Sequence, residues 1–375
     1  MTEIYLIRHA QAEGNSYHSM QGHWDSDVTA MGRRQIDCLA ERFREEKVDA
    51  LYASDLYRTR LTAGAITRYH DLPMHTTKLL REIHVGRWET LFFGNVIHDE
   101  PESAYLFMYD PDRWYMEGAE TYAQVADRAM EALREIVQAH PDQRVVVVSH
   151  GVTIRALLSR ITGIPLKDSK RLPICRNTSI SRILWDGQDF TVDYMNDYRH
   201  ILPLGDYPWN RNGDLRDEPL DLDADGDYYC ACYGDAWQFA HGSLRGFSSD
   251  PYLAAARQHA KSDPGTVLRF FRGDTPVGLI DMDSDRGAHA GYGWISLLYL
   301  RPEDRFQGYG SQALARAILH YQSMGRNSIR LHVAEDNTAA LAFYRREGFE
   351  TLSWENGSQG RLLLMERKLR HYGQV

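Results

Sequence analysis

The sequence predicts an α/β domain followed by an α+β domain. Three observations lead to this class. The length of 375 residues suits two domains, strand and helix patterns alternate over residues 1–200, and residues 203–227 carry no apolar period. We therefore expect a first domain at 1–202, an acidic Pro/Gly linker at 203–227 and a second domain at 228–375.

The first domain is expected to form a layered sheet with helices on both faces. The valines 145–148 show no alternation, which is typical of a parallel strand buried on both sides. Thr29 is a candidate N-cap, Gly163 a candidate helix end and Asp186-Gly187 a hairpin turn. The expected elements are strands at 3–7, 48–55 and 143–151, helices at 29–46, 56–70, 121–140 and 152–163, and a hairpin at 178–197.

Part of the expected linker resembles a calcium-binding loop. The first half of an EF-hand loop matches Asp221, Asp223, Asp225 and Gly226, but Cys232 occupies the twelfth position, where the last ligand should be a Glu. No helical pattern flanks the segment, so an acidic turn is the better interpretation.

The second domain mixes strands and helices in a different order. Gly273-Asp274 predicts the turn of a hairpin at 266–283. The other expected elements are helices at 250–262, 310–325 and 337–348, and strands at 293–300, 328–335 and 360–369.

The composition argues against several classes of protein. The net charge of −9 disfavours a nucleic-acid binder, and no apolar run approaches the roughly 20 residues that span a bilayer. The N-terminus lacks the features of a signal peptide. Four cysteines match no zinc pattern. We expect a cytoplasmic protein, with no partner among nucleic acids or membranes, whose thiols stay free; an oligomer is possible.

Polar residues follow several strands of the first domain. Arg8 and His9 follow the first strand, and His150 follows the four valines. Arg58 starts a helix, and Glu82 lies in a loop. An isolated Arg-His pair is ordinarily a surface feature. Ligands of α/β sheets, however, bind beyond the carboxyl ends of strands, so these residues can converge.

Such a set supports phosphoryl transfer without a metal. A neutral imidazole can attack phosphorus, guanidinium groups bind phosphate oxygens, and a carboxylic acid can protonate a leaving alkoxide. No carboxylate cluster that could bind Mg²⁺ accompanies the set.

These residues resemble the histidine phosphatase superfamily, also called phosphoglycerate mutase-like. Seven blocks of the sequence occur in the family's order. They are "LIRHAQAEGN", "QGHWDSDVTAMGRRQ", "SDLYRTRLTA", "LREIHVGRWE", "GAET", "VVVVSHG" and "NTSIS". The resemblance implies a three-layer α/β fold. It implies that His9 is the phosphorylated nucleophile, that Glu82 is the proton donor, and that a phosphate pocket and its entrance are lined by Arg8, Arg58, His150, Asn15, Gln21 and Gly22.

Three positions depart from the family pattern. Ala10 and Thr90 stand where relatives carry Gly, and Ser19 stands where they carry Arg. Ala10 should be tolerated if its φ is negative. The other two bear on substrate choice more than on chemistry.

The segment 90–120 is short, as in phosphatases of this family, whereas mutases carry a longer insertion. It is also aromatic, with Phe92, Phe93, Tyr105, Phe107, Tyr109, Trp114 and Tyr115. A lid over an organic substrate and ordinary packing explain these rings equally well.

A second motif lies between the strand at 293–300 and the helix that follows it. Arg305-x-x-Gly308-x-Gly310 lets backbone amides approach an anion at a helix N-terminus. The spacing lacks the third Gly of a dinucleotide fingerprint and the Lys of a P-loop. A strand, an Asn, a helix and a Tyr ahead of Gly-Phe follow it.

This order resembles the GNAT N-acetyltransferase superfamily over about residues 228–370. The resemblance implies that acetyl-CoA is the cofactor, that Asn337 contacts it and that Tyr344 protonates the departing thiolate. Strand 298–300, with Leu298 and Leu300, would pair with the pantetheine arm. The pyrophosphate loop would comprise Arg305, Phe306, Gln307, Gly308, Tyr309, Gly310 and Ser311. His332 and Glu335 are candidates for a general base, although a solvated strand end explains both.

We therefore expect a bifunctional enzyme. One domain would hydrolyse a small-molecule phosphate ester and the other would acetylate a small-molecule amine. The alternatives are a phosphatase regulated by a non-catalytic acetyl-CoA-binding domain, a mutase-type phosphotransferase, and a first domain that only binds phospho-ligands. Because the linker lacks an apolar period, 1–202 and 228–375 are expected to fold separately and to serve one pathway.

Overall fold

The computed structural model describes residues 1–168, 170–205 and 214–370. It divides into two compact units. The first comprises Met1–Leu91 and Val96–Arg211, and the second comprises Phe92–Asn95 and Asn212–Val375. The predicted boundary thus falls near the division, but a four-residue segment from the first half of the sequence belongs to the second unit.

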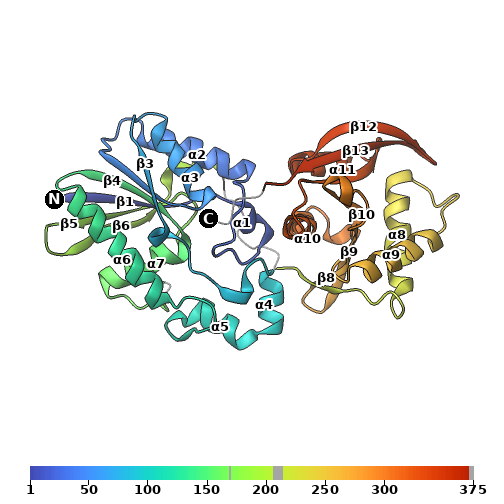
Figure 1. Ribbon diagram of the computed structural model, residues 1–375, viewed down its shortest axis with the longest axis horizontal. Helices are drawn as coiled ribbons and strands as arrows, with labels where there is room; N and C mark the ends of the chain where they lie inside the picture. Colours follow the sequence, from blue (N-terminus) through green and yellow to red (C-terminus); the bar gives the residue numbers. More distant parts are fainter. Residues whose placement is uncertain (169, 206–213, 371–375) are drawn as a thin grey trace. The chain divides into compact units, whose positions relative to one another are not determined.

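The first unit is a three-layer α/β sandwich around a six-stranded sheet of order β3-β2-β4-β1-β5-β6 (Figure 1). Helices α2 and α3 cover one face, and α6 and α7 cover the other. Its elements are β1 (Thr2–Arg8), α1 (Glu13–Tyr17), α2 (Ala30–Phe43), β2 (Ala50–Ser54), α3 (Tyr57–Thr67), β3 (Met74–Thr77), α5 (Pro101–Tyr109), α6 (Tyr122–Ala139), β4 (Arg144–Ser149), α7 (Gly151–Thr162), β5 (Ile180–Trp185) and β6 (Phe190–Asp197).

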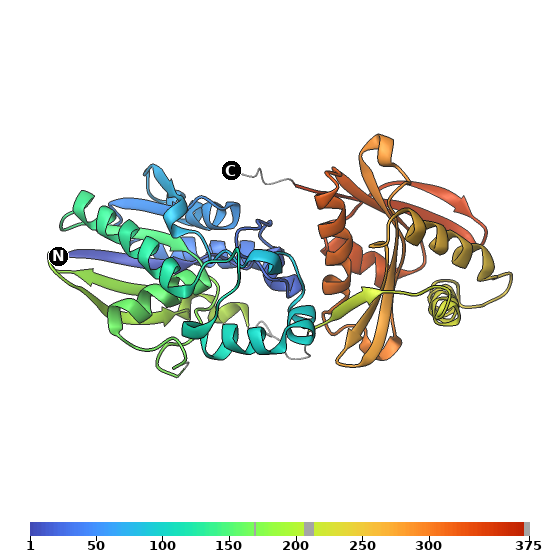
Figure 2. The same cartoon turned by 60° about the horizontal axis from the view of Figure 1, so that its bottom comes forward.

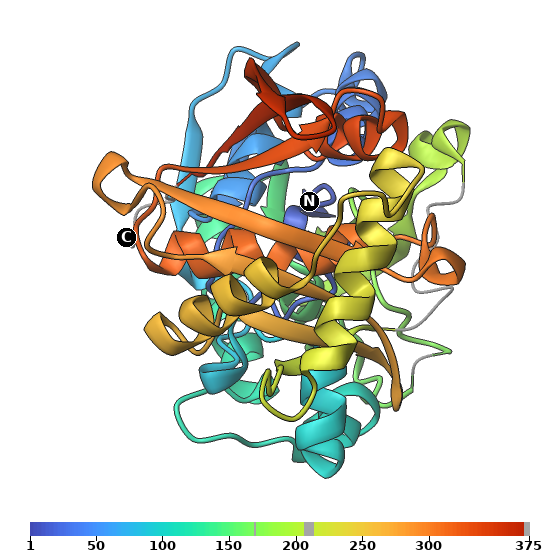
Figure 3. The same ribbon diagram turned by 90° about the vertical axis from the view of Figure 1, so that its right-hand side faces the viewer.

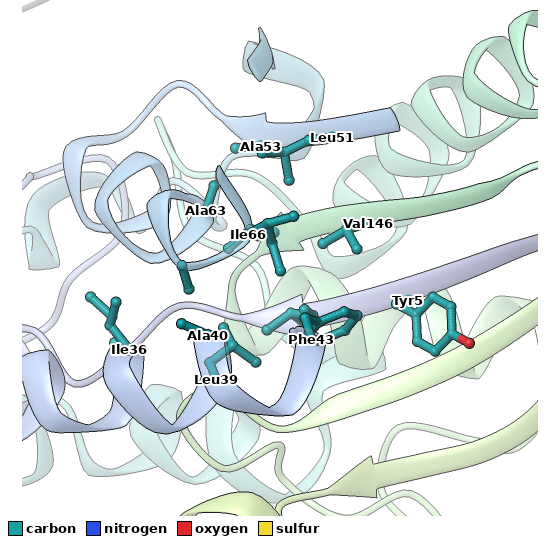
Figure 4. Close-up of a cluster of buried hydrophobic side chains, with 14 of the residues drawn as sticks. Tyr5, Ile36, Leu39, Ala40, Phe43, Leu51, Ala53, Ala63, Ile66 and Val146 are labelled. Atoms are coloured by element: carbon teal, nitrogen blue, oxygen red, sulfur yellow. The ribbon is translucent and has the colours of Figure 1, made fainter. Parts of the chain in front are cut away.

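Local sequence accounts for two of these boundaries. Thr29 caps α2, because its side chain accepts a hydrogen bond from the Gly32 amide, and Gly163 ends α7 at φ 70°. The valines of β4 are fully buried between the parallel strands β1 and β2, as predicted. Apolar side chains from α2, α3 and the sheet form the core on one face (Figure 4).

The pattern missed several short elements. Strand β3 has little burial, and the segment after Trp88 contains α4 (Phe93–Asp99) and α5. The 3-10 turns are Lys78–Leu80, Gly86–Trp88, Pro111–Arg113 and Arg199–Leu204 in this half of the chain, and Ala288–Ala290 and Pro302–Asp304 beyond it.

The second unit is built on a seven-stranded sheet of order β12-β13-β11-β10-β9-β8-β7. Helices α8 and α9 lie on one face and α10 lies on the other (Figures 2 and 3). Its elements are β7 (Arg216–Pro219), α8 (Gly226–His241), α9 (Asp250–Ser262), β8 (Val267–Arg272), β9 (Thr275–Asp283), β10 (Tyr292–Leu300), α10 (Tyr309–Ser323), β11 (Ser328–Ala334), α11 (Thr338–Arg346), β12 (Glu350–Gly357) and β13 (Gly360–Lys368).

The segment 203–227 differs from the predicted linker. Strand β7 lies inside it and pairs with β8, and α8 begins at Gly226. Residues 206–213 of the linker lie outside the described residues. Strand β7 could not be predicted from the apolar pattern, because it contains the charged residues Arg216, Asp217 and Glu218. Charged residues in an edge strand show no apolar alternation.

Candidate active sites

The first site forms where two parallel strands end side by side. Arg8 pairs with Ser149 at the ends of β1 and β4, so the residues that follow, His9 and His150, are neighbours. Their ring centroids are 5.2 Å apart. The predicted convergence at the carboxyl edge of the sheet therefore occurs.

The tautomer of His9 follows from its hydrogen bond. Nδ1 lies 2.7 Å from the Ala10 carbonyl oxygen, which can only accept, so Nδ1 carries the proton and Nε2 carries the lone pair. Burial, followed by the charges of Arg58 and Arg8, holds the pKa of His9 well below its ordinary value. The imidazole is therefore neutral near pH 7, which is the nucleophilic form.

Two buried guanidinium groups accompany the imidazoles. Arg58 is fully buried and donates to the Gly22 carbonyl at 2.8 Å, to the Trp24 carbonyl at 3.0 Å and to Asp25 at 3.2 Å. Arg8 donates to the Cys175 carbonyl at 2.6 Å. Burial lowers the pKa of both groups, but an arginine remains charged in proteins. The site thus concentrates positive charge below the surface.

His150 is fully buried at the start of α7. Neither of its ring nitrogens, nor Nε of Arg58, has a hydrogen-bond partner among the residues that the structure describes. A buried polar group without a partner costs about 1–3 kcal/mol. An oxyanion would supply the missing acceptors, so this arrangement favours a phosphate ligand.

The carboxylate of Glu82 lies at the N-terminus of α7. It accepts hydrogen bonds from the amides of Val152 and Thr153, each at 3.1 Å, and from the Thr153 hydroxyl at 3.2 Å. These donors lie two and three residues after His150, which brings the predicted proton donor to the same edge of the sheet.

The loop that carries Glu82 is fixed by Arg128. The guanidinium of Arg128 donates to the carbonyls of Leu79, Arg81 and Glu82 at 2.7–2.9 Å. It also bonds both carboxylate oxygens of Glu120. Burial alone would raise the pKa of Glu120, but these bonds outweigh it and the pKa is lowered. The "GAET" block thus acts through Arg128, a residue that the sequence pattern did not identify.

The predicted entrance residues take specific but mostly internal positions. Asn15 accepts from the Ala12 amide at 3.0 Å, and Gln21 donates to Ser26. Gly22 contributes its carbonyl to Arg58. A Cβ on Gly22 would lie 2.4 Å from the backbone carbonyl oxygen of Ile83, so this close approach requires glycine.

The "NTSIS" block contributes a residue that the sequence pattern missed. The Asn177 side chain donates to the His9 carbonyl at 2.9 Å, and the Thr178 amide donates to the Arg8 carbonyl at 3.0 Å. The block therefore fixes the backbone of Arg8 and His9. The match to the family order was the signal that could have identified it.

The three departures differ in consequence. Ala10 is absent from the residues with positive φ, so its methyl group is tolerated. Thr90 has φ 69°, which is strained for a β-branched residue. Ser19 is buried, and its hydroxyl has no partner within the described part of the chain.

Some aromatic side chains of the segment 90–120 are packed inside the first unit and others are exposed. Phe107 and Trp114 form an edge-to-face pair at 4.9 Å, and Trp114 also packs against Trp88. Tyr105, Tyr109 and Tyr115 are exposed. Packing therefore accounts for only part of these rings.

The second site lies where two strands of the second unit separate. β10 and β11 pair in parallel over Tyr292–Trp294 and Ser328–Arg330, whereas β10 continues its pairing with β9 as far as Leu300. A bulge between Ile295 and Leu297 marks the point of separation. On its β11 side, the stretch with Leu298 and Leu300 is thus open, within the described residues, to pairing with an extended ligand arm.

The glycine loop follows β10 and opens α10. Gly308, at φ 89°, is the N-cap of α10, and a Cβ on Gly310 would lie 2.9 Å from the ring of Phe343. The amides at this helix N-terminus can bind an anion. Phe306 is 92% exposed, whereas Tyr309 is buried.

Most side chains of the loop already have internal partners. Arg305 donates to the Leu300 carbonyl at 2.8 Å and to Asp235 at 3.1 Å, Gln307 donates to the Glu303 carbonyl, and Ser311 donates to Glu347 at 2.7 Å. The arrangement suits pyrophosphate binding by the backbone more than by these side chains.

The remaining predicted residues of this site lie on or near α11. The Asn337 side chain caps the helix by accepting from the Ala340 amide at 3.1 Å. Tyr344 is buried between Phe343 and Phe349, and burial raises its pKa. It is thus a protonated phenol, as a proton donor must be. His332 pairs with Glu355 at 2.9 Å, and Glu335 pairs with Arg361 at 3.6 Å. These contacts leave both residues as candidates for a general base.

No group of three or more side chains that could hold a metal ion occurs in the described ranges. The described helices include none that is both long and apolar enough to cross a membrane.

A phosphatase-type α/β unit and a unit with a separated strand pair are thus joined in one chain. The family model of the histidine phosphatase superfamily (branch 1) matches residues 4–198, and that of the acetyltransferase (GNAT) family matches residues 207–349. The chain belongs to the histidine phosphatase superfamily and carries a GNAT domain in its second half, which confirms both resemblances.

Three similar proteins each match about half of this chain. Metal-independent phosphoserine phosphatase of Arabidopsis thaliana is 32% identical over 219 residues, 58% of this chain and 90% of that protein. Phosphoserine phosphatase 1 of Hydrogenobacter thermophilus is 33% identical over 166 residues, 44% of this chain and 79% of that protein. The solved structure of Bacillus stearothermophilus YhfR shares 31% identity at a TM-score of 0.52, covering 54% of this chain and all of its own.

Proposed function

We propose that the first unit is a metal-independent phosphomonoesterase that works through a phosphohistidine at His9. The observation that carries this proposal is the buried set of two guanidinium groups and two neutral imidazoles, with unpartnered nitrogens on His150 and Arg58 among the described residues. In the first step Nε2 of His9 bonds to phosphorus while the ester P–O bond breaks, and protonated Glu82 gives its proton to the leaving alkoxide. In the second step water attacks phosphorus, the P–N bond breaks and the water proton returns to Glu82.

The substrate class is a small phosphate ester. Two relatives are named phosphoserine phosphatases, so phosphoserine is the first compound to assay. It carries both a phosphate ester and an amine, as expected if the two units serve one pathway. A relative named phosphoglycerate mutase-like protein 4 is also 33% identical over 207 residues, so 3-phosphoglycerate belongs in the same screen.

The test is steady-state phosphate release by the full chain. His9→Ala should lower turnover by at least about 10³-fold because the covalent route disappears. His75→Ala, on the exposed strand β3, is the control and should leave turnover unchanged. Excess EDTA should also have no effect. Near wild-type turnover in His9→Ala, or a loss with EDTA that metal restores, would contradict the proposal.

We further propose that the second unit binds acetyl-CoA and acetylates a small-molecule amine. The separated strands and the positive-φ Gly308 fit such a ligand, because they leave backbone amides exposed to a pantetheine arm and to a pyrophosphate. Leu298 and Leu300 would hold the arm, and the loop 305–311 would hold the pyrophosphate. Acetyl-CoA supplies the activated thioester, and Tyr344 is the candidate that holds a proton for the departing thiolate.

Transfer is tested with acetyl-CoA and a panel of amines. Thiol release should require both and should fall at least about tenfold in Tyr344→Phe, while CoA affinity stays the same. CoA binding without any transfer would favour the alternative of a regulatory acetyl-CoA-binding domain. A soluble cytoplasmic location is part of the proposal.

A further inference from the structure

Where β10 and β11 separate, a group of side chains lies on the face of the sheet opposite α10 (Figures 2 and 3). Gly293 faces α10, because a Cβ on it would meet the ring of Tyr321 at 2.3 Å. Successive residues of a strand point to opposite faces, so Trp294 lies on the other face. Trp294 pairs with Arg330, the last residue of β11 that pairs with β10, and His332 lies two residues further on. His332 therefore shares the face of Trp294, just beyond the point of separation.

The indole ring of Trp294 contacts two polar side chains beside this opening. The His332 ring meets it edge to face, with the ring centroids 4.8 Å apart. The guanidinium carbon of Arg286 lies 3.4 Å from the centroid of the same indole ring. Trp294 is buried under these groups, whereas Arg286 is exposed. A small ligand can therefore approach the guanidinium group from solvent and meet the imidazole close by.

Arg286 differs from the other arginine at this opening. Arg330 is paired with Glu366 at 2.9 Å. The guanidinium group of Arg286 makes no hydrogen bond or ion pair with any residue that the structure describes, while its backbone amide donates to the Asp283 carboxylate at 2.9 Å. A planar fork of N–H donors thus remains available, and a carboxylate is an acceptor that matches this fork with two bonds.

His332 offers a hydrogen-bond acceptor next to this fork. Its Nε2 lies 2.9 Å from the Glu355 carboxylate, which can only accept, so Nε2 carries the proton and Nδ1 carries the lone pair. Burial lowers the pKa of His332; the charge of Glu355 opposes this and that of Arg286 adds to it, and the net pKa is lowered. The ring is therefore neutral near pH 7, and Nδ1 can accept a hydrogen bond from an ammonium group.

We propose that the acceptor of the second unit is an amino acid, whose carboxylate binds Arg286 and whose ammonium group donates to Nδ1 of His332. Both charged groups of an α-amino acid are attached to one carbon atom, which suits a donor fork and an acceptor placed around a single indole ring. The inference deepens the proposed acetyltransferase activity and rests on it. It narrows the acceptor from any small amine to one that carries a carboxylate.

The test is calorimetry on the full chain saturated with CoA, which has no acetyl group to transfer. The probes are a panel of L-amino acids, beginning with serine, and the amine that remains when the carboxyl group of the tightest binder is replaced by hydrogen. The amino acid should bind at least about tenfold more tightly than this amine, because only the amino acid can use the guanidinium fork.

Variants assign this preference to its residue. In Arg286→Gln the preference for the amino acid over the amine should fall below about twofold, because the charged fork is lost. Arg257→Gln removes an exposed arginine on α9 that pairs with Asp223; it is the control and should keep the preference. His332→Ala should weaken both ligands by a similar factor, since both carry the ammonium group. A loss limited to the amino acid would overturn the assigned orientation.

The outcomes separate this inference from the activity on which it rests. If CoA does not bind, the cofactor site is wrong and the inference falls with it. If CoA binds but no amino acid does, or if the amine binds as tightly as the amino acid, the cofactor site stands and the assignment of the acceptor is wrong. This comparison of ligands on the unaltered chain decides the matter even if a variant is poorly folded.

Discussion

The two candidate sites of this chain use different parts of the polypeptide. In the first unit, buried side chains converge and several of their nitrogens lack partners among the described residues, whereas in the second unit the loop side chains are paired internally and the backbone remains available. A site made of side chains depends on individual residues, while a site made of amides depends on conformation. The same kind of substitution should therefore have unequal effects in the two units.

The largest expected effect concerns the independence of the two units. The fragment 228–375 lacks β7, part of α8 and the segment Phe92–Asn95, so Arg316 loses its partner Asp217. We expect it to be aggregated or unfolded by circular dichroism. The fragment 214–375 restores β7 and should be more soluble, although without Phe92 it should melt below the full chain. A stable, CoA-binding 228–375 would restore the simpler sequence-based prediction of separate folding.

Substituting one arginine in each unit tests whether the first site depends on side chains and the second on backbone amides. Arg58→Met should lower kcat/KM for a phosphomonoester by about 10²–10³-fold, because a buried charge aimed at the phosphate is lost. Arg305→Met should weaken CoA binding by less than about fivefold, since a partly exposed ion pair such as Arg305–Asp235 contributes at most about 1 kcal/mol. Kinetics and calorimetry measure the two effects. Comparable losses would remove the distinction.

The loop conformation is the sensitive feature of the second site. Gly308→Glu should weaken CoA binding at least about tenfold, through strain at positive φ and repulsion of the pyrophosphate. Gly325 lies near the other end of α10 and also has positive φ, and a Cβ added at either glycine would meet no atom within 4 Å. Gly325→Glu is therefore the matched control for strain. Equal losses in both variants would argue against an anion site at Gly308.

Two partly buried histidines, one in each unit, differ in how they respond to pH. In the second unit, burial would lower the pKa of His259, but hydrogen bonds and charges from Asp281 and Asp283 outweigh it and raise that pKa. In the first unit, burial lowers the pKa of His200 to about 4. His259 thus adds stability below its unfolded pKa of about 6.5 that is lost as pH rises through the folded pKa, whereas His200 opposes folding below about pH 6.5.

Thermal unfolding of variants between pH 5 and 9 measures this difference. The loss of Tm in His259→Gln should be largest below about pH 6.5 and should shrink as pH rises; each unit of pKa shift corresponds to about 1.4 kcal/mol. The Tm of His200→Gln, relative to that of the wild type, should rise as pH falls. Parallel pH profiles for the two variants would contradict the assigned charge states.

The smallest expected effect concerns backbone strain in the first unit. Thr90→Gly should stabilise the chain by about 0.5–1 kcal/mol, because glycine adopts φ 69° without a clash. Thr76→Gly, in the extended strand β3, should be destabilising and serves as the control. Denaturant midpoints measure both. A loss of stability in Thr90→Gly would indicate that the Thr side chain compensates for its strain.

Sequence order predicted that the candidate residues of the first site lie close together, because they sit at the ends of predictable elements. Arg8, His9 and His150 follow strongly apolar strands, so a correct sheet brings them together. The sequence did not predict the roles of Arg128 and Asn177, because both side chains donate to backbone carbonyls. Every residue has a backbone carbonyl, so such a partner cannot be recognised from the sequence.

The sequence by itself determined the two families of fold, the α/β order of the first unit and the candidate residues that follow its central strands, because apolar periodicity and motif order are local properties. Only the tertiary structure decided that Phe92–Asn95 belongs to the second unit, that Arg305 turns toward Asp235 and that Thr90 is strained. These features arise from contacts between residues far apart in the chain and from backbone angles imposed by packing. Neither is encoded in any short stretch of sequence.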